Sequence, residues 1–173
     1  MLQKFKRILK HRWRDIGTTQ KAIPPDMVAR LQQRVAASEK THSGEIRIFI
    51  ESGLPLSYLR RNAPMHQIIR QRAVTLFGKL RVWDTANNNG VLIYLLLAEH
   101  AIEVVADRGL NQAVDPLVWQ GMVAHMSRSF QQGQFEDGLT QALDEVSALL
   151  NQHFPLGVGQ INQNELSDTP LLR

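Results

Sequence analysis

The sequence contains no cysteine. That absence excludes disulfides, thiolate zinc sites, iron–sulfur clusters and catalysis by a cysteine nucleophile. The chain also lacks a long hydrophobic run, because its longest, residues 91–98, falls far short of the roughly 20 residues that a membrane-spanning helix needs. No apolar segment of the kind found in signal peptides follows the basic N-terminus, so we expect the chain to stay in the cytoplasm.

The short sequence signatures of common enzymes are missing as well. The chain has no G-x-S-x-G nucleophile turn, no H-E-x-x-H zinc motif, no phosphate-binding P-loop and no G-x-G-x-x-G dinucleotide motif. Its histidines never occur four residues apart, as two metal ligands on one helix face would. The absence of these short motifs does not exclude a site built from loops that are distant in the sequence.

Positive charge is present but concentrated at one end. Residues 1–22 carry a net charge of +6, whereas the whole chain carries +4, so the remaining residues sum to −2. A nucleic-acid-binding surface would spread over the folded domain, so we expect no specific nucleic-acid partner. Within residues 1–22, apolar side chains recur at helical spacings of three and four, at Leu2, Phe5, Leu9, Trp13 and Ile16.

Two interpretations of this basic amphipathic helix are open. It could lie on an anionic membrane surface, which would place the protein peripherally at the inner face of the membrane. It could instead dock on its own domain, with its charges in solvent. Residues 17–25 are expected to form a linker to the domain that follows.

Residues 23–153 have the periodicity of one folded domain. Helices are predicted from residue 26 to about 43, over 65–80, 115–129 and 134–153, and strands over 45–52, 91–98 and 102–106. The strand over 91–98 is apolar without alternation, which indicates a central strand covered on both faces. Residues 154–173 lose periodicity and are predicted to be a flexible tail.

The order of these elements predicts a fold. Helices that alternate with short strands are typical of a three-layer α/β/α sandwich, here with a small mixed central sheet of three to four strands. The strand over 102–106 is expected to pair with the central strand as an antiparallel hairpin, with Glu99 and His100 in the turn. The basic N-terminal helix would lie outside this sandwich.

Polar loop residues flank the central strand. Asp84, Asn88 and Asn89 precede it, Asp107 ends the next strand, and Asp115 opens the following helix. In a hairpin the start of one strand lies beside the end of the other, about 5 Å away. Carboxylate and amide oxygens suit Ca²⁺ or Mg²⁺. In the alternative interpretation, the Asn-Gly pair is only a turn and Asp115 only a helix cap.

The chain resembles the TPM domain family. Four segments match its successive blocks in order, from about residue 26 to 152: SGEIRIFIES, AVTLFGKLRVWDTANNNGVLIYLLL, AIEVVADRGLN and MSRSFQQGQFEDGLTQALDEV. The family is shared by a plant thylakoid-lumen phosphatase, a photosystem II assembly factor and many bacterial proteins. The resemblance implies an α/β/α sandwich, Ca²⁺ or Mg²⁺ bound by loop acids in some members, and a phosphatase label that derives from the plant member.

The resemblance also matches individual residues of this chain to positions of the family. Glu45 matches the acidic position that opens the first strand, and Asn88 and Asn89 match the first two positions of the family's Asp-Asn-Gly turn. Asp115 falls within one position of a family aspartate. Asn88 replaces the family's first aspartate and so loses one negative ligand, whereas Asp107 stands where many members have glycine and could restore that charge.

Three functions are compatible with these residues. The chain could be a module that binds a divalent cation and an unidentified protein partner, a metal-assisted phosphomonoesterase, or an adaptor at a membrane surface. No nucleophile is apparent near the loop acids, and Arg108 is the basic residue closest to them in the sequence. We therefore expect the binding module.

Overall fold

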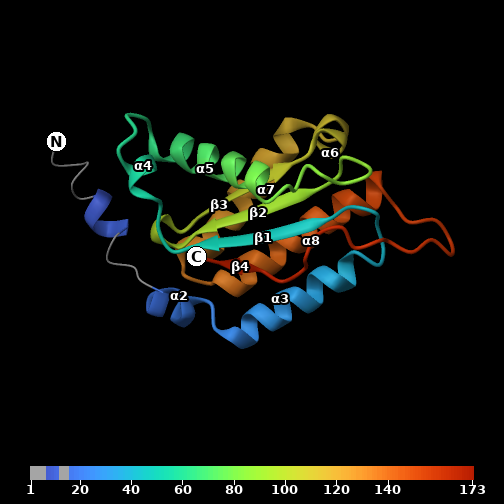
Figure 1. The fold of residues 1–173 in the computed structure, drawn as a ribbon, viewed down its shortest axis with the longest axis horizontal. Coiled ribbons are helices and arrows are strands. Elements are labelled where there is room, and N and C mark those ends of the chain that lie inside the picture. The colour runs from blue at the N-terminus through green and yellow to red at the C-terminus, as the bar shows by residue number, and fades with distance from the viewer. Residues whose placement is uncertain (1–6, 12–15) are drawn as a thin grey trace.

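The computed structural model describes residues 7–11 and 16–173. A mixed sheet of four strands in the order β3-β2-β1-β4 lies between two layers of helices (Figure 1). β1 (Ile46–Glu51) pairs in parallel with β2 (Val91–Leu96) and with β4 (Leu171–Leu172), and β2 pairs antiparallel with β3 (Ala101–Ala106). The predicted α/β/α sandwich with a small mixed sheet is confirmed.

Strand β2 is central and buried at every position, as its unbroken apolar sequence predicts. A short 3₁₀ turn, η1 (Leu97–Glu99), leads from β2 into β3. His100 closes this turn in the left-handed conformation with φ of 50°. The hairpin register, in which Val91 lies opposite Ala106, fixes which loop residues meet at the far end of the two strands.

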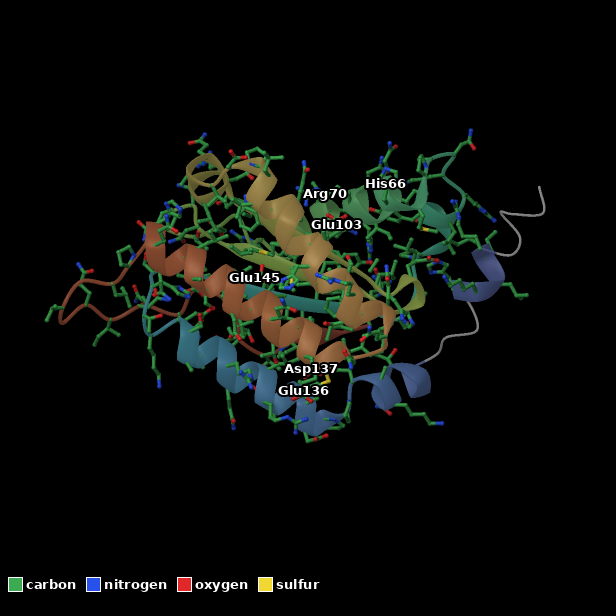
Figure 2. The ribbon with its side chains drawn as sticks, turned by 180° about the vertical axis from the view of Figure 1, so that it is seen from behind. His66, Arg70, Glu103, Glu136, Asp137 and Glu145 are labelled. Carbon is green, nitrogen blue, oxygen red and sulfur yellow. The ribbon has the colours of Figure 1, made fainter. Side chains whose placement is uncertain are left out.

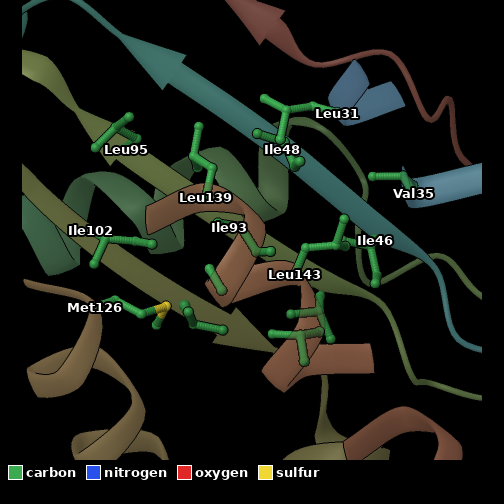
Figure 3. Packing of buried hydrophobic residues seen from close by; sticks show 14 of the residues in the cluster. Leu31, Val35, Ile46, Ile48, Ile93, Leu95, Ile102, Met126, Leu139 and Leu143 are labelled. Atoms are coloured by element: carbon green, nitrogen blue, oxygen red, sulfur yellow. The ribbon is translucent and has the colours of Figure 1, made fainter. Parts of the chain in front are cut away.

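Helices cover both faces of the sheet with apolar side chains at helical spacing. On one face α3 (Pro25–Ser38), α7 (Pro116–Gln131) and α8 (Phe135–His153) enclose the larger hydrophobic cluster (Figure 3). On the other face α5 (Met65–Lys79) and the short α4 (Leu56–Leu59) enclose the smaller one. Each side of the sheet therefore has its own core.

Several boundaries differ from the sequence predictions. Residues 17–25, expected to be a linker, contain most of α2 (Ile16–Ala22), and α3 ends at Ser38. Two further short helices, α4 and α6 (Arg108–Ala113), lie between the predicted elements. A helix of four to six residues is too short to show a stripe of apolar residues, which explains why periodicity missed both.

The prediction of a flexible tail over residues 154–173 is wrong at its C-terminal end. Leu171 and Leu172 pair with Phe49 and Ile50 of β1. Arg47 of β1 donates to the backbone oxygens of Ser167 and Thr169. These contacts are made by backbone groups and single side chains, so they leave no periodic pattern in the sequence.

Residues 7–11 are helical and contact the domain. His11 is buried and lies with Nε2 2.9 Å from Oε1 of Glu99, while Lys10 Nζ lies 3.0 Å from Oε2 of the same residue. These contacts agree with the docked interpretation for this short stretch. Three residues of the predicted stripe, Leu2, Phe5 and Trp13, lie outside the described residues, so membrane binding stays a prediction. No described helix combines the length and apolar character needed to cross a membrane.

Candidate functional site

The predicted site lies at the end of the sheet where β1 and β2 begin and β3 ends. The backbone N–H of Val91 donates to the oxygen of Glu45 at 2.8 Å, and the N–H of Asp107 donates to the oxygen of Gly90 at 2.9 Å. Glu45, Gly90 and Asp107 therefore form one row across three neighbouring strands. The hairpin brings the loop of Asn88 and Asn89 beside Asp107, as its predicted geometry requires.

The loop before β2 packs tightly against the start of α6. Asn88 adopts φ of 51°, a left-handed conformation that asparagine tolerates better than most residues. Its backbone oxygen accepts from Gly109 N at 2.9 Å, and its Oδ1 accepts from Nε and Nη2 of Arg108 at 2.9 and 2.6 Å. A Cβ on Gly109 would lie only 2.6 Å from the Asn88 oxygen, so this contact requires glycine.

Two buried oxygens at this end of the sheet have no hydrogen-bond partner among the described residues. Asn89, 0% exposed, donates from Nδ2 to Ser43 Oγ at 3.2 Å but leaves Oδ1 unpaired. Asp107, 9% exposed, accepts from Arg108 N at 2.7 Å through Oδ1 and leaves Oδ2 unpaired. An unpaired buried acceptor costs about 1–3 kcal/mol, and an ion or water commonly accounts for it.

The remaining predicted ligands are engaged elsewhere. Asp84 forms an ion pair with Arg81. Asp115 caps α7 by accepting from Leu117 N at 2.8 Å, which is the helix-cap alternative considered from the sequence. Within residues 7–11 and 16–173, no three acidic or histidine side chains converge as metal ligands would.

Glu45 occupies a different environment from the one that its sequence position indicates. Strand alternation places it on a polar face, yet the structure buries it under the C-terminal segment. Its carboxylate accepts from Leu166 N at 2.9 Å and from Asn162 Nδ2 at 3.2 Å. Burial raises the pKa of Glu45, and these hydrogen bonds offset part of the rise. A ligand that approaches the β2 loop would not find this carboxylate free.

A second carboxylate, missed by the sequence analysis, lies next to Glu45. Glu39 at the end of α3 is 6% exposed and accepts from Ile46 N at 2.9 Å. Burial raises the pKa of Glu39 to about 8; the hydrogen bond from Ile46 lowers it, and the negative charges of Glu45 and Asp168 raise it further. Glu39 follows Leu31 and Val35 at the helical spacing of four, so the continuation of this buried stripe is the sequence signal that could have found it.

The opposite end of β1 also contains a buried charged group. Glu51 receives two hydrogen bonds from Arg72, at 2.9 and 2.6 Å, and a third from the hydroxyl of Tyr94 at 2.8 Å. All three side chains are buried. Because a ligand has no access to them, we assign this group to stability.

The donor set fits a divalent cation in part. Ca²⁺ takes about six to eight oxygen ligands. The loop offers Asn89 Oδ1 and Asp107 Oδ2, and it would add Asn88 Oδ1 if the exposed Arg108 side chain moved away. One carboxylate among amide oxygens, with a guanidinium nearby, would give only weak binding.

Comparisons with known proteins agree on the fold. The chain is similar to the BA42 protein from the psychrophilic bacterium Bizionia argentinensis, with 24% identity and a TM-score of 0.73, over 87% of this chain and 95% of that one. It is also similar to the N-terminal domain of a P. gingivalis protein, with 20% identity and a TM-score of 0.55, over 75% and 77% of the two chains. No curated protein matches the chain.

The family comparison is more specific. The family model of the TPM domain matches residues 18–149, which include every helix and strand from α3 to α7 and most of α8. This match includes the Asn88–Asn89 turn and Asp107, and it agrees with the order of the sequence blocks. The chain therefore belongs to the TPM domain family.

Proposed function

We propose that this protein is a binding module that takes a divalent cation, Ca²⁺ or Mg²⁺, at the loops of Asn88, Asn89 and Asp107, and that it acts through a protein partner. The observation that carries the proposal is the pair of buried oxygens, Asn89 Oδ1 and Asp107 Oδ2, that lack a partner in the described part of the chain. Asp107 lies opposite Gly90 across the hairpin, and Asn89 directly precedes Gly90 in the loop. A cation coordinated by both oxygens would remove the cost of burying them unpaired.

The ligand set predicts weak binding. Affinity for Ca²⁺ rises with the number of charged ligands, and Asp107 is the single carboxylate among the described residues whose buried oxygen is unpaired. Asp84 and Asp115 are exposed and remain candidates for outer ligands, whereas Glu45 is covered by the C-terminal segment. We therefore expect dissociation constants of about 10⁻⁴ to 10⁻³ M, the range of low-affinity calcium modules.

A phosphatase activity is the alternative, and the local geometry does not favour it. The hydroxyls of Ser43 and Thr85 contact the loop, but each accepts a hydrogen bond from Asn89, and none of the described residues is bonded to either as a general base. The basic side chain of Arg108, which contacts the loop, is hydrogen-bonded to Asn88. Phosphoryl transfer needs a positioned nucleophile and a clamp for the phosphate oxygens.

An NMR titration of the ¹⁵N-labelled protein with CaCl₂ and with MgCl₂ tests the proposal. The amides of residues 84–90 and 107–115 should shift together at millimolar cation. Asp107→Asn should weaken binding several-fold because it removes the charged ligand, and Arg108→Gln should strengthen it because it frees Asn88 Oδ1 and removes a repelling charge. Asp144→Asn, an exposed change on α8, is the matched control.

Two outcomes would count against the proposal. The first is that the amide signals of both loops remain unshifted at 10-millimolar Ca²⁺ and Mg²⁺. This concentration is roughly ten times the largest dissociation constant of low-affinity calcium modules. The second is a metal-dependent rate with a generic phosphomonoester that disappears in Asp107→Asn while the fold is intact, since this would favour the phosphatase.

A further inference from the structure

Strand β3 leaves one edge of the sheet open among the described residues. In an antiparallel pair, alternate residues direct their backbone groups toward the neighbouring strand. The bond from Asp107 N to the Gly90 oxygen sets this alternation, so the N–H and C=O groups of Ile102, Val104 and Ala106 point away from β2. Such groups are a template for the addition of another strand.

A groove runs along this open edge. It is a cavity of about 500 Å³ between α5 and α7, the helices that pack on either face of β3. The α7 side is apolar, with Trp119 and Val123, and the α5 side carries Arg70. Val104 and Ala106 of β3 form part of its wall.

Two polar groups in the groove indicate that a hydrogen-bonding occupant is missing. Arg70 Nη1 donates to the outward oxygen of Val104 at 2.7 Å, a bond that a neighbouring strand would otherwise make. Nε1 of Trp119 is buried without a hydrogen-bond partner in the part of the chain that the structure describes. The Arg70 side chain therefore occupies one position of a backbone ladder, and the indole of Trp119 lines the α7 side of the groove.

Charge on the α5 side specifies what kind of segment would enter. The Arg70 side chain is 49% exposed, and its Nη1 makes both the bond to Val104 and a 3.3 Å contact with Glu103, while Nε and Nη2 form no hydrogen bond to a described residue. His66 lies one turn earlier on α5 and affects Glu103 electrostatically. These three side chains lie together beside α5 (Figure 2). Because Nε and Nη2 of Arg70 make no hydrogen bond to a described residue, this side chain can donate to a further carboxylate that enters the groove.

We propose that the groove binds an extended segment of a partner protein that has alternating apolar and acidic side chains, and that this segment pairs with β3. Successive side chains of a strand point to opposite faces, so the apolar ones would pack on Trp119 and Val123 and the acidic ones would face Arg70 and His66. A second copy of the chain fits less well. The β3 edge of that copy lies between its own helices, which would run into α5 and α7 before the two edges could pair. The inference is independent of the cation site.

A synthetic peptide tests this inference with the full-length protein. The probe is an acetylated and amidated pentapeptide of alternating valine and glutamate, and the control peptide has the same composition with its two glutamates adjacent. In ¹⁵N NMR spectra the alternating peptide should shift the amides of Val104 and Ala106 and the indole N–H of Trp119. It should also slow hydrogen exchange at the two amides, because they would enter a ladder. The control peptide should bind several-fold more weakly.

Variants separate the backbone contribution from the charge contribution. Ala106→Pro removes an outward N–H but no bond to β2, a position where an edge strand tolerates proline, and should weaken binding about tenfold or more. Arg70→Gln should weaken binding of the glutamate peptide about threefold, and should leave a valine–threonine peptide unaffected. If Ala106→Pro does not fold, a peptide methylated on the backbone nitrogens that face β3 serves instead with the unchanged protein.

Three results would overturn the inference. They are unshifted Val104 and Ala106 amides at millimolar peptide, equal affinity for the methylated and unmethylated peptides, and edge amides that are already protected in a concentration-dependent dimer. The last result would identify the occupant as a second copy of the chain.

Discussion

The two ends of strand β1 each bury a glutamate, and they stabilise it in different ways. Glu51, at the end of the strand, is bonded by the charged side chain of Arg72 and by Tyr94. Glu45, just before the strand, is bonded by a backbone N–H and an amide from residues more than a hundred positions later in the chain. The first carboxylate has an opposite charge beside it, and the second has only neutral donors.

This difference determines what each end depends on. A carboxylate beside a buried guanidinium has its charge compensated, and loss of the partner leaves a buried charge without compensation. A carboxylate held by neutral donors depends on the segment that supplies them, and burial then moves its pKa upward. The Glu51 end should therefore respond most to mutation, and the Glu45 end to pH and to the C-terminal segment.

Arg72→Met should have the largest effect, because it leaves Glu51 buried without a cation. We expect a loss of about 3–5 kcal/mol in the free energy of unfolding, measured by urea denaturation. Arg60→Met, at an exposed position, is the matched control and should change stability by less than about 0.5 kcal/mol. Equal losses in the two variants would show that the ion pair contributes little.

Glu45→Ala should have the next largest effect. It removes the acceptor of Leu166 N and Asn162 Nδ2 and should cost about 1–3 kcal/mol. Glu45→Gln keeps one acceptor oxygen and should cost less. Thermal unfolding gives the loss, and hydrogen exchange at Leu166 N shows whether the C-terminal segment detaches. Unchanged exchange in Glu45→Ala would separate the segment from this carboxylate.

Ionisation of Glu39 should change the free energy of unfolding by a smaller amount, and this change should depend on pH. Its pKa of about 8 in the folded state lies above the ordinary 4.5, so the folded protein binds the proton more tightly than the unfolded chain does. The resulting stability is fully present below about pH 4.5 and is lost as pH rises through 8.

The measurement for Glu39 is the free energy of unfolding at several pH values between 5 and 8. The slope contributed by this group is at most about 1.4 kcal/mol per pH unit. Glu39→Gln should flatten the pH dependence and Asp144→Asn should not. A slope that is the same in the unchanged protein and in Glu39→Gln would assign it to other groups.

The sequence predicts the sandwich well because its central elements are strongly patterned. The apolar run from Val91 indicates a buried strand, and the stripes of α3, α5 and α8 indicate helices with one buried face. The hairpin then follows from the short turn at His100. Long periodic segments average over many residues, so local exceptions do not hide them.

The environment of single polar side chains is much less predictable. Alternation places Glu45 and Glu51 on a polar face, but the C-terminal segment covers one and Arg72 of α5 pairs with the other. Asp107 was identified as a loop acid, yet its additional role as the cap of α6 depends on a helix too short to detect. These environments are set by tertiary contacts between distant segments, which one sequence does not display.

Strand β4 has a consequence for the order in which the sheet assembles. Its partners on β1 are Phe49 and Ile50, and they pair with Leu171 and Leu172, so most of the chain lies in the loop that this pairing closes. The entropy lost on closing a loop grows with the logarithm of its length, and the β2–β3 hairpin closes a far shorter one. Only two residues of β4 are in register to offset that loss. The strand that completes the sheet is thus the one with the largest closure entropy and the fewest backbone bonds to oppose it.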